Sequence, residues 1–204
     1  MRGMRAAGFV FLSIPFAALP WLAAGGSDAP AWHPGKATDY SNQANEKVVI
    51  GVKEFSNPDE AAAVFGPKVD LNKYGFLPVL VVIENHRSQT LDLQALEVEL
   101  VAPNGNHVKP VPPDEIPYIA KPGQRPSMQK LPFPTPKKKN PMAGGSLSER
   151  AFAAKVVPAG DSASGFFYFE AHSDPDLKLY LSGLKEMPSG HELFYFEVGM
   201  SPMR

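Results

Sequence analysis

Short apolar runs separated by polar turns dominate the sequence beyond about residue 46. The most apolar of them covers residues 79–83 (VLVVI), with Pro78 just before it and Asn85 just after it. A short run of β-branched and aliphatic residues without alternation favours a strand that is buried on both faces. Proline and asparagine are depleted in strand interiors and mark strand ends. We therefore expect a central strand here, in preference to a buried helix.

A second pattern follows directly. Residues 96–100 (LEVEL) alternate strictly between apolar and acidic side chains, which is typical of a half-solvated strand with Glu97 and Glu99 on the outer face. Asn104-Gly105 then predicts a hairpin turn. Residues 78–109 are expected to form three successive strands.

Further strands are expected at residues 47–55, 164–169, 177–181 and 192–198, and residues 152–157 can form a strand or a helix turn, which brings the total to about eight. In the strand at 192–198, Leu193, Tyr195 and Glu197 alternate with Phe194, Phe196 and Val198. One short helix is expected to start at Asn57, with proline and two acids in its first turn, and to stop at Gly66-Pro67. The predicted core comprises Val81, Ile83, Leu96, Val98, Leu100, Phe167, Phe169, Leu179 and Phe196.

The N-terminus has the pattern of an export signal. Arg2 and Arg5 precede an apolar stretch over residues 6–22, and small residues follow at 23–25. An uncleaved membrane anchor is the alternative, but Pro15 and Pro20 interrupt the stretch. We expect a signal peptide over residues 1–26, a flexible leader over 27–46 and one domain over 47–200, located in the periplasm or outside the cell, with no transmembrane span after cleavage.

Residues 111–145 interrupt this domain. They are rich in proline and contain Lys137, Lys138 and Lys139. Since proline cannot donate to a sheet ladder, this segment is predicted to be a long loop insertion.

Composition narrows the classes of protein. A chain of 204 residues with 44% hydrophobic residues supports one domain, and 22 prolines disfavour long helices. The absence of cysteine excludes a disulfide scaffold, a zinc–thiolate site, a thiol nucleophile and a lipid anchor on cysteine. Without the two arginines of the signal, 18 basic residues face 21 acidic ones, which argues against nucleic-acid binding.

The arrangement of these patterns resembles secreted bacterial immunoglobulin-like domains of envelope proteins. The residues that carry the resemblance are 79–85, Asn104-Gly105, 157–160 (VPAG) and 165–169 (GFFYF). The resemblance implies an all-β fold, an immunoglobulin-like antiparallel β-sandwich with one short helix. It implies no particular activity.

Candidate chemistry is sparse. Met187, His191, Met200 and Met203, with His172 nearby, could supply soft ligands to copper, which makes a periplasmic metal carrier one alternative function. Glu170 is the acid most expected to be buried, but paired catalytic carboxylates, a Gly-x-Ser-x-Gly nucleophile motif and a phosphate loop are missing from the sequence. We therefore expect no enzyme and no cofactor.

The basic cluster in the insertion suggests a partner. Lys137, Lys138 and Lys139, with Phe133 beside them, could contact an envelope protein or another anionic surface. The sequence predicts an exported, non-enzymatic binding or structural module of the cell envelope. An accessory domain of an envelope enzyme is a further alternative.

Overall fold

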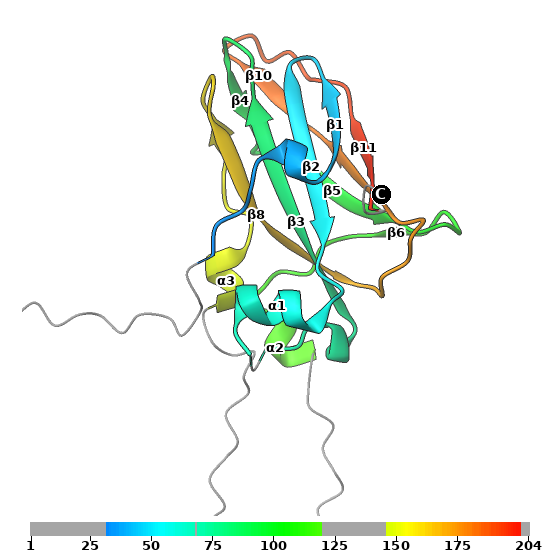
Figure 1. The fold of residues 1–204 in the computed structure, drawn as a ribbon. Coiled ribbons are helices and arrows are strands. Elements are labelled where there is room, and N and C mark those ends of the chain that lie inside the picture. Colours follow the sequence, from blue (N-terminus) through cyan, green and yellow to red (C-terminus); the bar gives the residue numbers. More distant parts are fainter. Residues whose placement is uncertain (1–31, 68, 120–145, 201–204) are drawn as a thin grey trace, which may run out of the picture.

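The computed structural model describes residues 32–67, 69–119 and 146–200. These residues form eleven strands in three antiparallel sheets, together with a few short helices (Figure 1). The expected all-β class is confirmed. No helix within the described ranges is long and apolar enough to cross a membrane.

The sheets divide the strands unequally. Sheet A has the order β1-β2-β3-β8, formed by Ser41–Asn45, Val48–Glu54, Phe76–Asn85 and Ser162–Glu170. Sheet B has the order β10-β4-β7, formed by Lys185–Met187, Thr90–Asp92 and Val156–Val157. Sheet C has the order β11-β9-β5-β6, formed by Phe196–Gly199, Lys178–Ser182, Glu97–Val101 and His107–Val108.

The apolar run of β3 lies at the centre of sheet A, between β2 and β8, as the sequence predicts. Val79, Val81 and Ile83 belong to the main core, whereas Leu80 and Val82 belong to a second apolar cluster on the other face of the sheet. Both faces of β3 are therefore covered, which explains why its sequence does not alternate.

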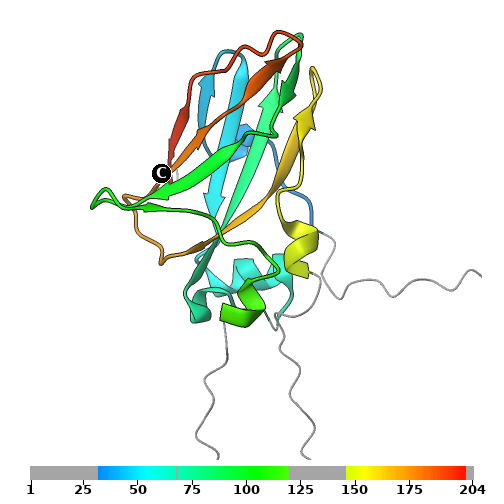
Figure 2. The ribbon, with the colours of Figure 1, turned by 180° about the vertical axis from the view of Figure 1, so that it is seen from behind.

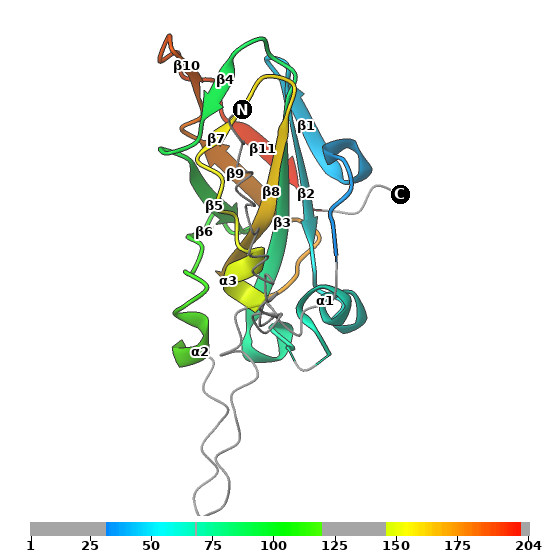
Figure 3. The same cartoon turned by 90° about the vertical axis from the view of Figure 1, so that its left-hand side faces the viewer.

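The main core lies between two layers. Figure 3 shows sheet A along one side of the molecule and sheets B and C along the other, and the view from behind in Figure 2 brings β5 and β9 to the front. Seven of the nine predicted core residues are buried there. Leu96 and Phe167 are only half-buried, because they line an opening of about 540 Å³ at the side of the two layers.

The helices of the described residues are η1 (Ala37–Asp39), α1 (Pro58–Phe65), η2 (Asn72–Tyr74), α2 (Ile116–Ile119) and α3 (Ser146–Arg150). Helices α1, η2, α2 and α3 gather at one end of the molecule, and together with η1, which lies further along the sheet beside β2, they cover the outer face of sheet A (Figure 1). Helix α1 starts as expected, since the Asn57 side chain accepts a hydrogen bond from the amide of Asp59 and proline occupies the first turn.

The first described residues also join the fold. Instead of a flexible leader, residues 37–45 form η1 and β1, and Trp32 lies against Phe55 and Phe166 with ring centroids 6.0 and 5.5 Å apart. The predicted signal peptide and most of the predicted insertion, residues 120–145, lie outside the described residues.

Two strand predictions need correction. Residues 78–109 contribute to four strands instead of three, because a turn at residues 93–96 separates β4 from β5 and places them in different sheets. Residues 192–198 are not one strand. Leu193 is buried, Phe194 is 71% exposed, and the strand β11 starts only at Phe196.

Candidate functional site

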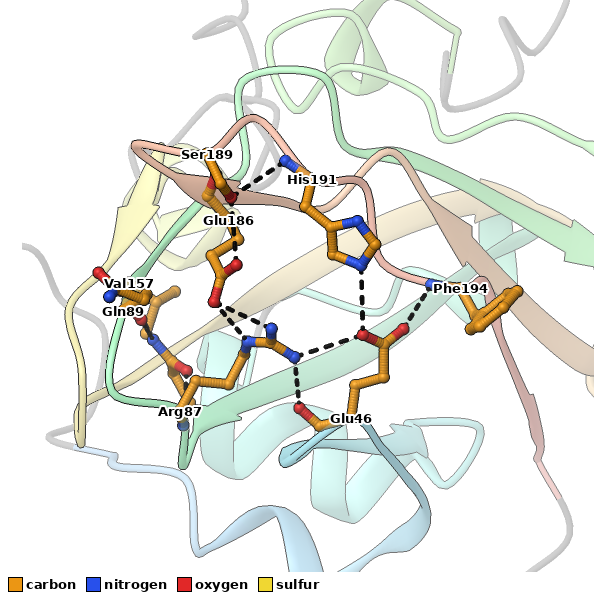
Figure 4. Close-up of polar contacts among 9 residues, drawn as sticks. Glu46, Arg87, Gln89, Val157, Glu186, Ser189, His191 and Phe194 are labelled. Carbon is orange, nitrogen blue, oxygen red and sulfur yellow. Dashed lines mark hydrogen bonds and ion pairs between the residues drawn. The ribbon is translucent and has the colours of Figure 1, made fainter.

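A polar cluster surrounds Arg87, the second residue after the end of β3 (Figure 4). Three parts of the chain meet there: Glu46 from the turn between β1 and β2, Glu186 from β10, and His191 from the loop after β10. We call these four residues the Arg87 cluster. They join both layers of the fold at the end opposite the helices (Figure 1).

The guanidinium of Arg87 is fully engaged. Its Nε and Nη2 donate to Oε1 of Glu186 at 3.3 and 2.9 Å, and its Nη1 donates to the backbone carbonyl of Glu46 at 2.7 Å. The carboxylate of Glu46 lies 3.4 Å from Nη1 of Arg87 and 3.6 Å from Nε2 of His191. Its other oxygen accepts a hydrogen bond from the amide of Phe194 at 3.0 Å.

The turn held by this cluster has an unusual backbone. A two-residue hairpin loop with positive φ at both positions normally carries Asn-Gly or a similar pair. Here Glu46 and Lys47 take φ values of 47° and 61°. The carbonyl of Lys47 accepts a hydrogen bond from the amide of His86 at 2.9 Å, so contacts from the end of β3 fix both residues.

The charges within the cluster largely offset one another. The hydrogen bond from Arg87 is the main cause that holds the pKa of Glu186 below its ordinary value, and the hydroxyl of Ser189 adds a smaller effect. Beside the ion pairs lies a shallow depression of about 260 Å³, lined by Glu46, Lys47, Arg87, Ser88 and Glu186. Because each nitrogen of the Arg87 guanidinium already donates to a group of its own chain, we infer that the cluster stabilises the turn at Glu46 and Lys47.

Asn85 reinforces the same end of the molecule. Its side chain is completely buried, and its amide nitrogen lies 2.8 to 3.0 Å from the carbonyl oxygens of Gln89, Val157 and Pro158. Its side-chain oxygen accepts a hydrogen bond from the amide of Arg87 at 3.0 Å. The residue thus ties the start of β4 and the end of β7 to the central strand.

A different surface carries exposed aromatic rings. On the outer face of sheet C, Tyr180 of β9 pairs directly with Glu99 of β5 on one side and with Glu197 of β11 on the other. The ring of Tyr195 stacks on Tyr180, with centroids 5.1 Å apart and planes at 29°. We call this surface the tyrosine face; its members are Tyr180, Tyr195, Glu97, Glu99, Glu197, Lys178 and His107.

The carboxylates of the tyrosine face already hold cations from their own sheet. Nζ of Lys178 donates to Glu197 at 2.7 Å, and Nδ1 of His107 lies 2.7 Å from Glu99. The hydrogen bond to Glu197 is the main cause that raises the pKa of Lys178 above its ordinary value. The aromatic part continues into the loop before β11, where Tyr195 is 53% and Phe194 is 71% exposed.

The structure separates the residues considered as metal ligands. Met187 lies exposed on β10, His191 belongs to the Arg87 cluster, and Met200 is buried in the main core. Met203 lies outside the described residues, as do Lys137, Lys138, Lys139 and Phe133, which were expected to bind a partner. Within the described part of the chain, no three His, Cys, Asp or Glu residues are grouped so that they could hold a metal ion.

The expectation that Glu170 is buried is wrong. It is the last residue of β8 and lies exposed beyond the aromatic side chains of that strand. By contrast, Glu97 and Glu99 lie on the outer face of their strand, as the alternation predicts.

No protein-family model matches the chain, and no curated protein matches it. The candidate sites are therefore argued from this structure alone.

Sequence reasoning did not identify Arg87, Glu46 or Glu186, since nothing in the local pattern connects them. The alternation of residues 177–181 does place Tyr180 and Lys178 on a solvated face, and this signal could have identified these two members of the tyrosine face.

Proposed function

We propose that this protein is an exported, non-enzymatic binding module of the cell envelope, built on an immunoglobulin-like β-sandwich. Export is inferred from the N-terminal pattern of two arginines, an apolar stretch and small residues. The strand order supports the immunoglobulin-like topology. Sheet A contains β2-β3-β8 and sheet C contains β11-β9-β5, the positions that strands A-B-E and G-F-C take in an immunoglobulin domain.

One observation carries the binding role: large aromatic side chains are exposed together at the tyrosine face and the loop beside it. Phe194 is 71% and Tyr195 is 53% exposed, and Tyr195 rests on Tyr180. Tyrosine and other aromatic residues are enriched at protein interfaces, where they bury large areas at a small entropic cost. The strands beneath form a rigid support, and on such a support the loops usually carry recognition.

Co-sedimentation of the purified protein with cell-envelope fractions tests this role. The test variant is the double substitution Phe194→Ser and Tyr195→Ser, which removes the exposed rings and leaves the buried residues of β11 in place. The matched control is Tyr118→Ser, since Tyr118 is 76% exposed on α2 at the other end of the molecule.

We expect the double variant to bind at least tenfold more weakly than the wild type, because central aromatic residues usually dominate binding energy. The control should bind as the wild type does. Equal binding by all three proteins would exclude this surface as the site.

A further inference from the structure

We infer that the tyrosine face binds a cationic partner, a peptide segment that presents lysine or arginine side chains; this inference rests on the binding role proposed above. The pairing of the strands carries it. Tyr180 lies between Glu99 and Glu197, each directly opposite it on a neighbouring strand. Directly opposed residues have Cβ atoms about 4.5–5.5 Å apart, so one group above the ring of Tyr180 can reach both carboxylates.

The chemistry of this arrangement selects cations. The face of an aromatic ring carries negative electrostatic potential and attracts ammonium and guanidinium groups within about 6 Å of its centroid. Carboxylates on both sides add charge-assisted hydrogen bonds for the same group. The ring of Tyr195 stacks on one face of Tyr180, and because Tyr195 is itself 53% exposed, its own outer face also attracts cations.

The charge of the face is complementary to such a partner. Three carboxylates, those of Glu97, Glu99 and Glu197, face two basic side chains, Lys178 and His107, so the acidic groups are in excess whether or not the histidine carries a charge. The side chain of Glu97 has no ion pair or hydrogen bond to the residues that the structure describes. It therefore remains available to a cation from outside.

The cations already present on the face can be exchanged. In the pair of Lys178 with Glu197 the side chains are 54% and 43% exposed, and in the pair of His107 with Glu99 they are 54% and 24% exposed. Exposed pairs of this kind contribute little to stability. A partner with several cations can therefore replace both without disturbing the sheet.

Titration of the full-length mature protein with hexalysine tests the inference, with hexaglutamate and a neutral Gly-Ser hexapeptide as reference peptides. The test variant is Glu99→Gln with Glu197→Gln. Its control, Glu60→Gln with Glu115→Gln, changes the net charge equally at the helical end, and Glu60 also pairs with a lysine, Lys53, at 2.9 Å. A third variant, Tyr180→Val, removes the ring and keeps a residue that favours strands.

We expect hexalysine alone to bind the wild type, and binding to weaken as salt rises. The Glu99/Glu197 variant should bind at least tenfold more weakly, the control within twofold of wild type, and Tyr180→Val about two- to fivefold more weakly. Circular dichroism and thermal unfolding of each variant show whether it is folded. If Tyr180→Val is not folded, Tyr195→Ser provides the aromatic test, since Tyr195 lies outside the strands.

If the Glu60/Glu115 control lowers the affinity for hexalysine as much as the Glu99/Glu197 variant does, the effect is due to net charge alone and the inference is overturned. The inference would also be overturned if the wild type failed to bind hexalysine, or if it bound the neutral Gly-Ser hexapeptide equally well. If hexalysine fails while envelope binding still requires Phe194 and Tyr195, the binding module stands and only the cationic ligand is wrong. If the wild type does not bind hexalysine and the Phe194/Tyr195 double variant binds the envelope as the wild type does, the proposed function fails as well.

Discussion

Replacing Asn85 by alanine tests whether this residue joins the turns at one end of the molecule. The buried amide nitrogen has three backbone carbonyls within 3.0 Å, and the side-chain oxygen holds the amide of Arg87. Leaving the buried carbonyl of Val157 without a donor costs about 1–3 kcal/mol. Since the amide nitrogen has only two hydrogens, the half-buried carbonyls of Gln89 and Pro158 share one further bond. That bond and the half-buried bond from the amide of Arg87 are replaced in part by water, so each loss costs about 0.5–1.5 kcal/mol.

Together these losses predict that Asn85→Ala destabilises the protein by about 2–6 kcal/mol. For a chain of this size the unfolding midpoint should fall by about 4–24 °C. The comparison is Asn42→Ala, since the side chain of Asn42 makes one exposed hydrogen bond, from its Nδ2 to the carbonyl of Tyr40 at 2.8 Å. That variant should lose less than about 1 kcal/mol.

Urea unfolding monitored by circular dichroism gives both free energies. Asn85→Asp sharpens the test, because at neutral pH it places a carboxylate against three carbonyl oxygens and should destabilise the protein more than alanine does. If Asn85→Ala and Asn42→Ala lower the free energy of unfolding equally, the buried amide does not hold the turns and the reasoning is refuted.

Two other changes test the turn and the second apolar cluster. Lys47→Gly should stabilise the protein by about 0.5–1.5 kcal/mol, because glycine adopts the positive φ of 61° without strain; an unchanged or lower unfolding midpoint would contradict this. Burial raises the pKa of Tyr168 far above its ordinary value of 10.0, and its hydroxyl donates to the carbonyl of Leu147 at 2.8 Å. The stability that this tyrosine contributes is present below pH 10 and is lost at higher pH, where the unfolded chain ionises and the folded one does not. Tyr168→Phe should cost about 1–2 kcal/mol at pH 7 and make the alkaline loss of stability shallower, whereas parallel stability curves against pH for the two proteins would exclude this contribution.

The elements that follow from local pattern were predictable. The run at residues 79–83 has no polar position, so it requires cover on both faces, and β3 receives it from the main core and from the second cluster. Helix α1 carries its own start and stop in Asn57, Pro58 and Gly66. In both cases the deciding pattern lies within about ten residues along the chain, although the contacts that cover β3 come from distant residues.

The candidate sites depend on contacts that local pattern does not encode. Arg87 reaches Glu46, 41 residues before it, and Glu186, 99 residues after it. The alternation around Tyr180 predicts its solvated face, but the two carboxylates beside it come from β5 and β11, whose pairing with β9 is a property of the whole sheet. The pattern within one strand predicts which of its side chains are solvated, but it does not predict which strands will lie beside it.

The exposure of Phe194 shows how the two sites are linked. The alternation of residues 192–198 would direct Phe194 inward with Phe196, yet Leu193 is buried and Phe194 is exposed. The amide of Leu193 donates to the carbonyl of Leu184, and the amide of Phe194 donates to the carboxylate of Glu46, which Arg87 and its own strained turn hold in place. These two bonds fix the backbone on both sides of this change of direction, and the second of them comes from the Arg87 cluster. The bond from Phe194 to Glu46 positions the exposed ring of Phe194 beside the tyrosine face. The Arg87 cluster therefore stabilises the loop that carries part of the proposed binding surface.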